Sequence, residues 1–163
     1  MYEEEPDDRD AYKKLPVYQK AMEITELSVK ISEYISDEIN DKVTGTELQL
    51  AKFHAEEMVS NAFIIPAKIA GAAGADLYDL QMENAAIIRK AARDLQVGCN
   101  GFTHCDINGL EYLDILRDEI ELFRVEFAEW VKTFDPWNYV IDRWGLFNPP
   151  GVEYDDHDPD DDL

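Results

Sequence analysis

The stretch LEYLDILRDEIELFRVEFAEWVKTF, residues 110–134, carries the most regular apolar pattern in the 163-residue chain. Its large apolar side chains recur at steps of three and four residues, at Leu113, Leu116, Ile120, Phe123, Phe127, Trp130 and Phe134. This spacing places them along one side of an α-helix, as in the seam of a helical bundle. Asp135-Pro136 is expected to end the helix, because proline lacks an amide donor and restricts the residue before it.

Three earlier segments show the same periodicity. The first, Leu15 to about Asp41, repeats Val17, Ala21, Ile24, Ser28, Ile31, Ile35 and Ile39. The second has Leu48, Ala51, Ala55, Met58, Ala62, Ile65, Ile69 and Ala72, and Thr46 with Gln49 predicts a capping box at its start. The third, Leu77 to about Phe102, has Leu80, Ile87, Ile88, Ala91, Leu95 and Cys99. Each pattern predicts a long amphipathic helix.

The connections between these segments are short and rich in turn residues. AGAAGAD, residues 70–76, is expected to turn through left-handed glycines, with Asp76 capping the next helix. CNGFTHCDING, residues 99–109, forms a second polar break. Further apolar stripes flank the seams, at Tyr112, Ile115 and Leu122 and at Val59, Phe63 and Ala70. We therefore predict an all-α, up-down-up-down antiparallel four-helix bundle rather than a coiled-coil rod.

Composition divides the chain into four parts. Residues 1–14 form an acidic N-terminal segment, residues 15–134 the bundle, residues 135–154 an irregular aromatic arm, and residues 155–163 an acidic tail. The candidate partner-binding residues of the arm are Trp137, Tyr139, Trp144, Phe147 and Tyr154. Such a density of aromatic side chains is expected to be buried, either along the chain's own bundle, on a neighbouring subunit or on another protein. The tail has too little apolar content to fold by itself.

Charge excludes the most general binding classes. The chain holds 36 acidic and 15 basic residues, for a net charge of −21. A chain this acidic repels nucleic acids and anionic membranes unless its few bases gather in one place. The candidate basic cluster is Arg89, Lys90 and Arg93 in the third segment. The acidic tail is itself a candidate occupant of a basic surface, either this cluster on a neighbouring copy or the surface of a nucleic-acid-binding partner.

The chain shows no sign of membrane insertion or export. No segment reaches 18 consecutive apolar residues, and the opening MYEEEPDDRD lacks the basic flank and apolar stretch of a signal peptide. The two cysteines, Cys99 and Cys105, lack CxxC spacing and suit a reducing compartment. We expect a cytoplasmic protein with free thiols.

Catalytic and metal-binding patterns are missing from the sequence. A di-metal bundle needs paired Glu-x-x-His motifs, and neither His54, His104 nor His157 has a Glu three residues before it. His54 with Glu57 occurs only once, and Cys99, His104 and Cys105 lack a fourth ligand. No nucleophile elbow or phosphate-binding loop is present. We therefore expect a protein that is not an enzyme and holds no cofactor. Pro66, inside the second segment, is expected to bend that helix.

Three blocks resemble one known family. Leu15–Glu23 (LPVYQKAME) resembles the motif LxVWQKAxEL, Ile65–Ala70 (IPAKIA) resembles IPxNIAEG, and Ile87–Leu95 (IIRKAARDL) resembles IAxGSxxEL. These motifs are typical of the small four-helix-bundle proteins encoded in bacterial 23S ribosomal RNA intervening sequences. That family includes the accessory variability determinant of diversity-generating retroelements. The resemblance covers roughly residues 15–134 and implies a bacterial protein that forms a homopentamer.

Two functions follow as hypotheses. The first is a non-catalytic oligomeric scaffold or adaptor that binds protein partners. The alternative, implied by the resemblance, is an accessory protein of a retroelement reverse transcriptase that binds nucleic acid through Arg89, Lys90 and Arg93. The net charge favours the first.

Overall fold

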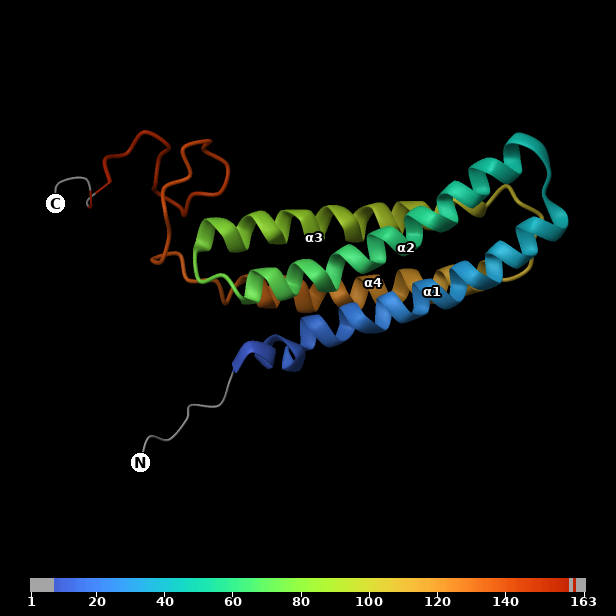
Figure 1. Cartoon of the computed structure of the whole chain (residues 1–163), viewed down its shortest axis with the longest axis horizontal. Coiled ribbons are helices and arrows are strands. Elements are labelled where there is room, and N and C mark those ends of the chain that lie inside the picture. Colours follow the sequence, from blue (N-terminus) through green and yellow to red (C-terminus); the bar gives the residue numbers. More distant parts are fainter. Residues whose placement is uncertain (1–7, 159, 161–163) are drawn as a thin grey trace, which may run out of the picture.

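The computed structural model describes residues 8–158 and 160, and within them the chain is an antiparallel four-helix bundle (Figure 1). The elements are η1 (Asp8–Lys14), α1 (Pro16–Lys42), α2 (Gly45–Ala73), α3 (Tyr78–Gly98), η2 (Cys99–Phe102) and α4 (Leu110–Val131). The four long helices alternate in direction around one core, and the arm continues past the end of the bundle where α3 begins. The predicted fold class is confirmed.

The core consists of the predicted seams. In α1 all seven predicted positions are buried, from Val17 to Ile39, and in α2 the seam from Ala51 to Ala72 is buried. Leu113, Leu116, Ile120, Phe123 and Trp130 of α4 are also buried, and Phe134 is buried just beyond the helix. Strict steps of three and four therefore identified the inward faces of these helices.

Several predicted core positions are wrong. Leu80 and Ile87 of α3 are exposed, because the buried face of that helix follows Ala85, Ile88, Ala91 and Leu95 instead. Phe127 is only half-buried. Four residues of the apolar stripes that flank the predicted seams are exposed and not packed inside the bundle: Tyr112, Ile115, Leu122 and Phe63. The bundle thus leaves apolar side chains in contact with solvent.

The helix ends also differ from prediction. The residue preceding α2 is Thr44, and no capping side chain bonds there, so the Thr46–Gln49 capping box does not form. Leu77, not Asp76, precedes α3. Gly74 is right-handed, at φ −81°, so the second connection needs no left-handed glycine. The fourth helix ends at Val131, before Asp135-Pro136, and its last apolar residues sit in turns.

Pro66 lies inside α2 and is buried. Proline has no amide to donate to the carbonyl four residues earlier, here that of Ala62. The Thr25 hydroxyl of α1 lies 2.9 Å from the Ala62 oxygen and equally close to that of Ala21 on its own helix. The single hydroxyl proton is shared between these two carbonyls, so a side chain of α1 offers a donor to the carbonyl that Pro66 leaves without one, and the helix continues for another two turns.

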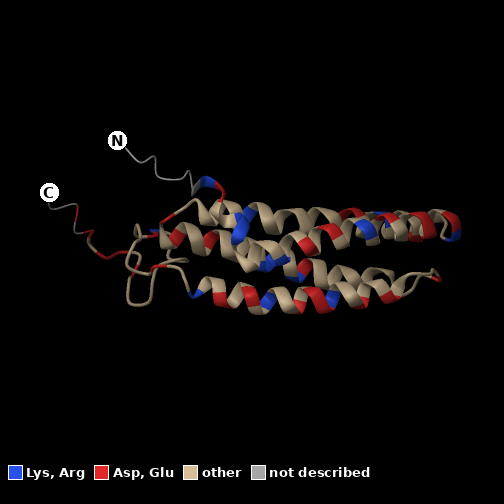
Figure 2. Cartoon of the chain, turned by 90° about the horizontal axis from the view of Figure 1, so that it is seen from below, with Lys and Arg blue, Asp and Glu red and all other residues tan. Residues whose placement is uncertain are grey.

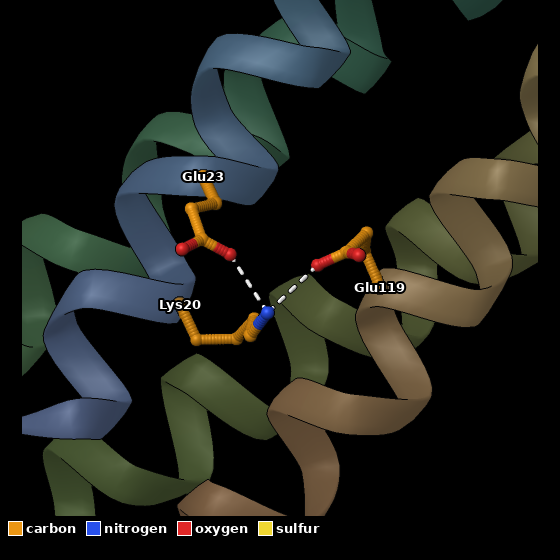
Figure 3. Close-up of polar contacts among 3 residues, drawn as sticks. All are labelled: Lys20, Glu23 and Glu119. Atoms are coloured by element: carbon orange, nitrogen blue, oxygen red, sulfur yellow. Dashed lines mark hydrogen bonds and ion pairs between the residues drawn. The ribbon is translucent and has the colours of Figure 1, made fainter.

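One ion-pair group joins α1 to α4. The Lys20 ammonium donates to Glu23 Oε2 at 2.7 Å and to Glu119 Oε2 of α4 at 2.9 Å (Figure 3). The hydrogen bond to Glu23, followed by that to Glu119, raises the pKa of Lys20. The side chain is only 22% exposed, so this contact is less screened than the ion pairs elsewhere on the helices.

The connection before α4 is fixed by one carboxylate and one glycine. The Asn108 amide donates to Glu38 Oε2 of α1 at 2.9 Å. The hydrogen bond from Lys42, together with this amide, lowers the pKa of Glu38. Gly109 has φ +91° and lies against the Tyr34 ring, where a Cβ atom would clash. Both features require glycine at the start of α4.

Acidic residues are spread along the helices, and the fewer Lys and Arg residues lie among them (Figure 2). The bases of α4 are paired locally, Arg117 with Asp114 and Arg124 with Glu121. These exposed pairs contribute little to stability. Among the described residues, the bases that form no ion pair with a carboxylate include Lys14, Lys52, Lys68, Arg89 and Arg93.

Candidate functional site

The predicted metal and nucleophile candidates do not converge. His54 is half-buried and its ring contacts Phe53 and Phe102, whereas His104 is exposed. The Cys99 thiol donates to the Leu95 carbonyl at 3.3 Å. Within residues 8–158 and 160, no three His, Cys, Asp or Glu side chains lie close enough together to hold a metal ion.

Both cysteines are free and buried. Burial raises the pKa of Cys99 to about 11 and also raises the pKa of Cys105. A reactive cysteine needs the opposite shift, since the thiolate is the nucleophile. These two thiols therefore behave as small core residues.

An apolar groove lies between α3 and α4. These are the neighbouring helices that pack least closely, and a cavity of about 440 Å³ opens between them. Its apolar lining is Ala92, Ile120, Phe123, Phe127, Ala128 and Val131. Ala92 of α3 and Ala128 of α4 both line the cavity, and a methyl group fills little of the space between two helices. Its volume is within the range of roughly 300–1,000 Å³ that ligand pockets occupy.

Arginines border this groove. Arg89 and Arg93 of α3 and Arg124 of α4 line it, with Glu121 as the one acidic lining residue. Arg124 is bound to Glu121 at 2.6 Å. Arg89 and Arg93 form no ion pair with any carboxylate in the part of the chain that the structure describes. Both side chains are exposed, so they can reach an anionic group at the edge of the apolar lining.

The structure therefore groups a different set of bases from the predicted cluster. Arg89 and Arg93 lie together on the groove, but Lys90 does not line it and is paired with Asp94. Arg124, which is distant in sequence, joins them from α4. Sequence reasoning missed Arg124 because its neighbours depend on which helices pack side by side. Alanines on the facing sides of two helices were the available signal for a groove.

The aromatic arm is built around Asp142. Its carboxylate accepts the backbone amides of Trp144, Leu146 and Phe147 at 2.8–2.9 Å. The Phe147 amide is the main cause of the lowered pKa of Asp142, supported by those of Trp144 and Leu146. Gly145, at φ +74°, allows the turn. Arg143 then fixes the segment that follows, because its guanidinium donates to the carbonyls of Tyr154 and Asp156.

The start of the arm is attached to the N-terminal end of α3. The Tyr78 amide donates to the Asn138 carbonyl at 2.8 Å, and Asn138 Nδ2 donates to the Asp76 carbonyl at 3.0 Å. The Val140 amide donates to Asp79 Oδ1 at 3.3 Å. The arm is thus an ordered element although none of its described residues lies in an α-helix or a strand.

The predicted binding residues of the arm differ in exposure. Trp137 is 88% and Trp144 is 92% exposed, and Tyr154 is also exposed. Tyr139 and Phe147 are half-buried within the arm. The arm therefore does not pack its tryptophans on its own bundle, which was one of the expected arrangements. Residues 1–7 of the acidic N-terminal segment and residues 159 and 161–163 of the acidic tail lie outside the described residues.

Comparison of the chain with protein-family models, with curated proteins and with solved structures gives no match. Among the described residues, none of the helices has the length and apolar character needed to span a membrane.

Proposed function

We propose that this protein is a non-catalytic oligomeric scaffold or adaptor that binds protein partners, and that it assembles as a homopentamer. The observation that carries the proposal is the arm, which holds Trp137 and Trp144 at 88% and 92% exposure on an ordered backbone. Tryptophan is enriched among the residues that dominate binding energy at protein interfaces. An ordered loop also loses little entropy on binding.

Self-association is supported by a second observation. Exposed apolar side chains run along α4, including Ile115, Leu122 and Val125, and along α2, including Phe53 and Phe63. Contiguous apolar surface on a protein marks an interaction site. The number five comes from the family resemblance alone. A cytoplasmic location belongs to the same proposal and is supported by the two free thiols.

Two measurements test the adaptor function. Light scattering over a range of concentrations should give a mass above that of the 18.7 kDa chain, whereas a constant 18.7 kDa contradicts oligomerisation. Affinity capture with quantitative mass spectrometry should then enrich the same protein with the wild type and lose it with Trp137→Ser/Trp144→Ser. Val97→Ser is the matched control, because Val97 is 67% exposed but lies outside both the arm and the groove.

The alternative is a nucleic-acid-binding accessory protein, and the grouping of Arg89, Arg93 and Arg124 favours it. Local potential rather than net charge steers a polyanion. Labelled RNA and DNA should be titrated at about 50 and 200 mM salt, where phosphate contacts weaken steeply. Micromolar binding with that salt dependence would replace the adaptor proposal, and absence of binding would leave it in place.

A further inference from the structure

We propose that the aromatic arm of one copy docks into the α3–α4 groove of the next copy, with Trp144 on the apolar floor and the acids Glu153 and Asp155 beside Arg89 and Arg93. This inference rests on the proposed self-association and specifies the surfaces that produce it. The two surfaces complement each other in both shape and charge.

The groove has the properties of an acceptor. Its floor is formed by alanines and by the faces of Phe123 and Phe127, and its 440 Å³ are open to solvent. Arg89 and Arg93 stand at its edge without an acidic partner in the described chain. Arg89 and Arg93 are exposed in the single chain, so an occupant that covers them should bring at least one carboxylate together with a large apolar group, because covering an unpaired charge costs free energy.

The arm has the properties of a donor. Trp144 is almost fully exposed although a tryptophan side chain can bury about 150–250 Å². Residues 135–163 carry nine acidic residues against one arginine. Glu153 and Asp155 are exposed and form no ion pair with any described base. The arm thus presents the apolar group and the carboxylates that the groove lacks.

The arm does not reach the groove of its own chain. Its hydrogen bonds to Tyr78 and Asp79 fix it at the first turn of α3. Arg89, the nearest groove residue on α3, lies 11 residues further along, about 16 Å at the rise of an α-helix. From its attachment the arm runs away from the helices, beyond the end of the bundle (Figure 1). Val131, at the α4 end of the groove, precedes the arm by only four residues, but Trp137 and Trp144 are exposed and do not line the groove. We therefore assign the arm that fills the groove to another copy.

A contact between two different surfaces has a consequence for symmetry. Arm and groove are not the same patch, so each copy is donor to one neighbour and acceptor from another. Such head-to-tail contacts close into rings when the rotation allows, and otherwise continue as filaments. An isologous dimer would instead use one patch twice.

Complementation between two variants tests this arrangement. Trp144→Ser removes the docking side chain but leaves the groove, and Arg89→Glu/Arg93→Glu changes the groove but leaves the arm. Each variant alone should fall to 18.7 kDa by light scattering, while an equimolar mixture should form a species of twice that mass. Lys90→Glu is the matched control, because Lys90 lies between these arginines in sequence but outside the groove, and it should keep the wild-type mass.

The outcomes separate this inference from the function on which it rests. If the wild type is a monomer at every concentration, both are wrong. If the wild type is oligomeric but either variant keeps its mass, or the mixture yields no larger species, only the arm-in-groove contact is wrong. Ala128→Trp, at an exposed groove position, is a second acceptor variant should the double arginine variant not fold. Its failure to lower the mass would likewise overturn the inference.

Discussion

The Thr25 hydroxyl occupies the place of an amide that α2 does not have. It lies 2.9 Å from the Ala62 carbonyl, which Pro66 leaves without its helical donor. Thr25→Val keeps the shape of the side chain but leaves this buried carbonyl unpaired. We expect the free energy of unfolding to fall by about 1–3 kcal/mol in urea titrations. Thr25→Ser, which retains the hydroxyl, should cost less.

A double-mutant cycle distinguishes this pairing from a general packing effect. In a Pro66→Ala background the helix regains its own amide, so Thr25→Val should cost less there than in the wild type. Equal costs in the two backgrounds would show that the hydroxyl does not substitute for the missing donor.

Ser28 lies one turn from Thr25 on the same face of α1, and its buried hydroxyl has no hydrogen-bond partner among the described residues. Ser28→Ala removes an unpaired polar atom without adding volume. We expect it to raise the free energy of unfolding by up to about 1 kcal/mol. Ser32→Ala is the control and should lower the free energy of unfolding, because the Ser32 hydroxyl donates to the Ala55 carbonyl at 3.1 Å.

The buried thiol of Cys99 makes the stability of the fold depend on pH in the alkaline range. Its pKa is raised from 9.0 to about 11, so its contribution to stability is complete below pH 9 and is lost as pH rises through 11. At pH 8 a thiol of pKa 11 is about a hundredfold less ionised than one of pKa 9. In a Cys105→Ala variant we therefore expect Cys99 to react with a thiol reagent only as urea unfolds the protein. Rapid reaction in the native state would place Cys99 outside the core.

At the scale of elements, the sequence predicted inward faces better than helix ends. Steps of three and four identify a seam because a helix has one buried side, and this succeeded for α1, α2 and α4. In α3 apolar residues occur on two sides, so Leu80 and Ile87 were assigned wrongly. Helix ends depend on backbone angles that residue type determines only weakly, as the exposed Thr46 shows.

The backbone conformation of the arm depends on the Asp142 carboxylate. Asp142→Ala removes the acceptor of three amides, so hydrogen exchange at Trp144, Leu146 and Phe147 should accelerate while the bundle amides keep their rates. Because the pKa of Asp142 is lowered, the arm should hold at neutral pH and loosen as pH falls below the ordinary aspartate value of 3.8. Asp135→Ala is the matched control, because among the described residues the Asp135 carboxylate accepts a single backbone amide, that of Trp137. Unchanged exchange at all three amides would contradict this role.

At the scale of the whole molecule, 36 acids repel one another against only 15 bases. Screening by salt should relieve this repulsion more than it weakens the exposed ion pairs. We expect the thermal midpoint to rise as NaCl is increased from about 20 to 500 mM, where the screening length falls to a few ångströms. A midpoint that falls would mean that ion pairs such as Lys20–Glu119 outweigh the repulsion.

The relation between arm and groove is what the sequence alone did not reveal. Arg89 and Arg93 were identified from their spacing, but their setting depends on Arg124 and on two alanines that only packing brings opposite each other. The aromatic content of the arm was evident, whereas its exposure depends on the attachment to Asp76 and Asp79. Long-range neighbours of this kind follow from the arrangement of helices and not from any one segment.

The three tryptophans divide between two environments, and this gives the molecule a built-in optical reporter. Trp130 is 8% exposed and its ring contacts Phe134 at 4.8 Å, whereas Trp137 and Trp144 stand in water. Indole fluorescence shifts to shorter wavelength when the ring leaves water. Light emitted at the blue edge therefore reports on the helices, and light at the red edge reports on the arm. Unfolding moves the first toward the red, while covering the arm moves the second toward the blue.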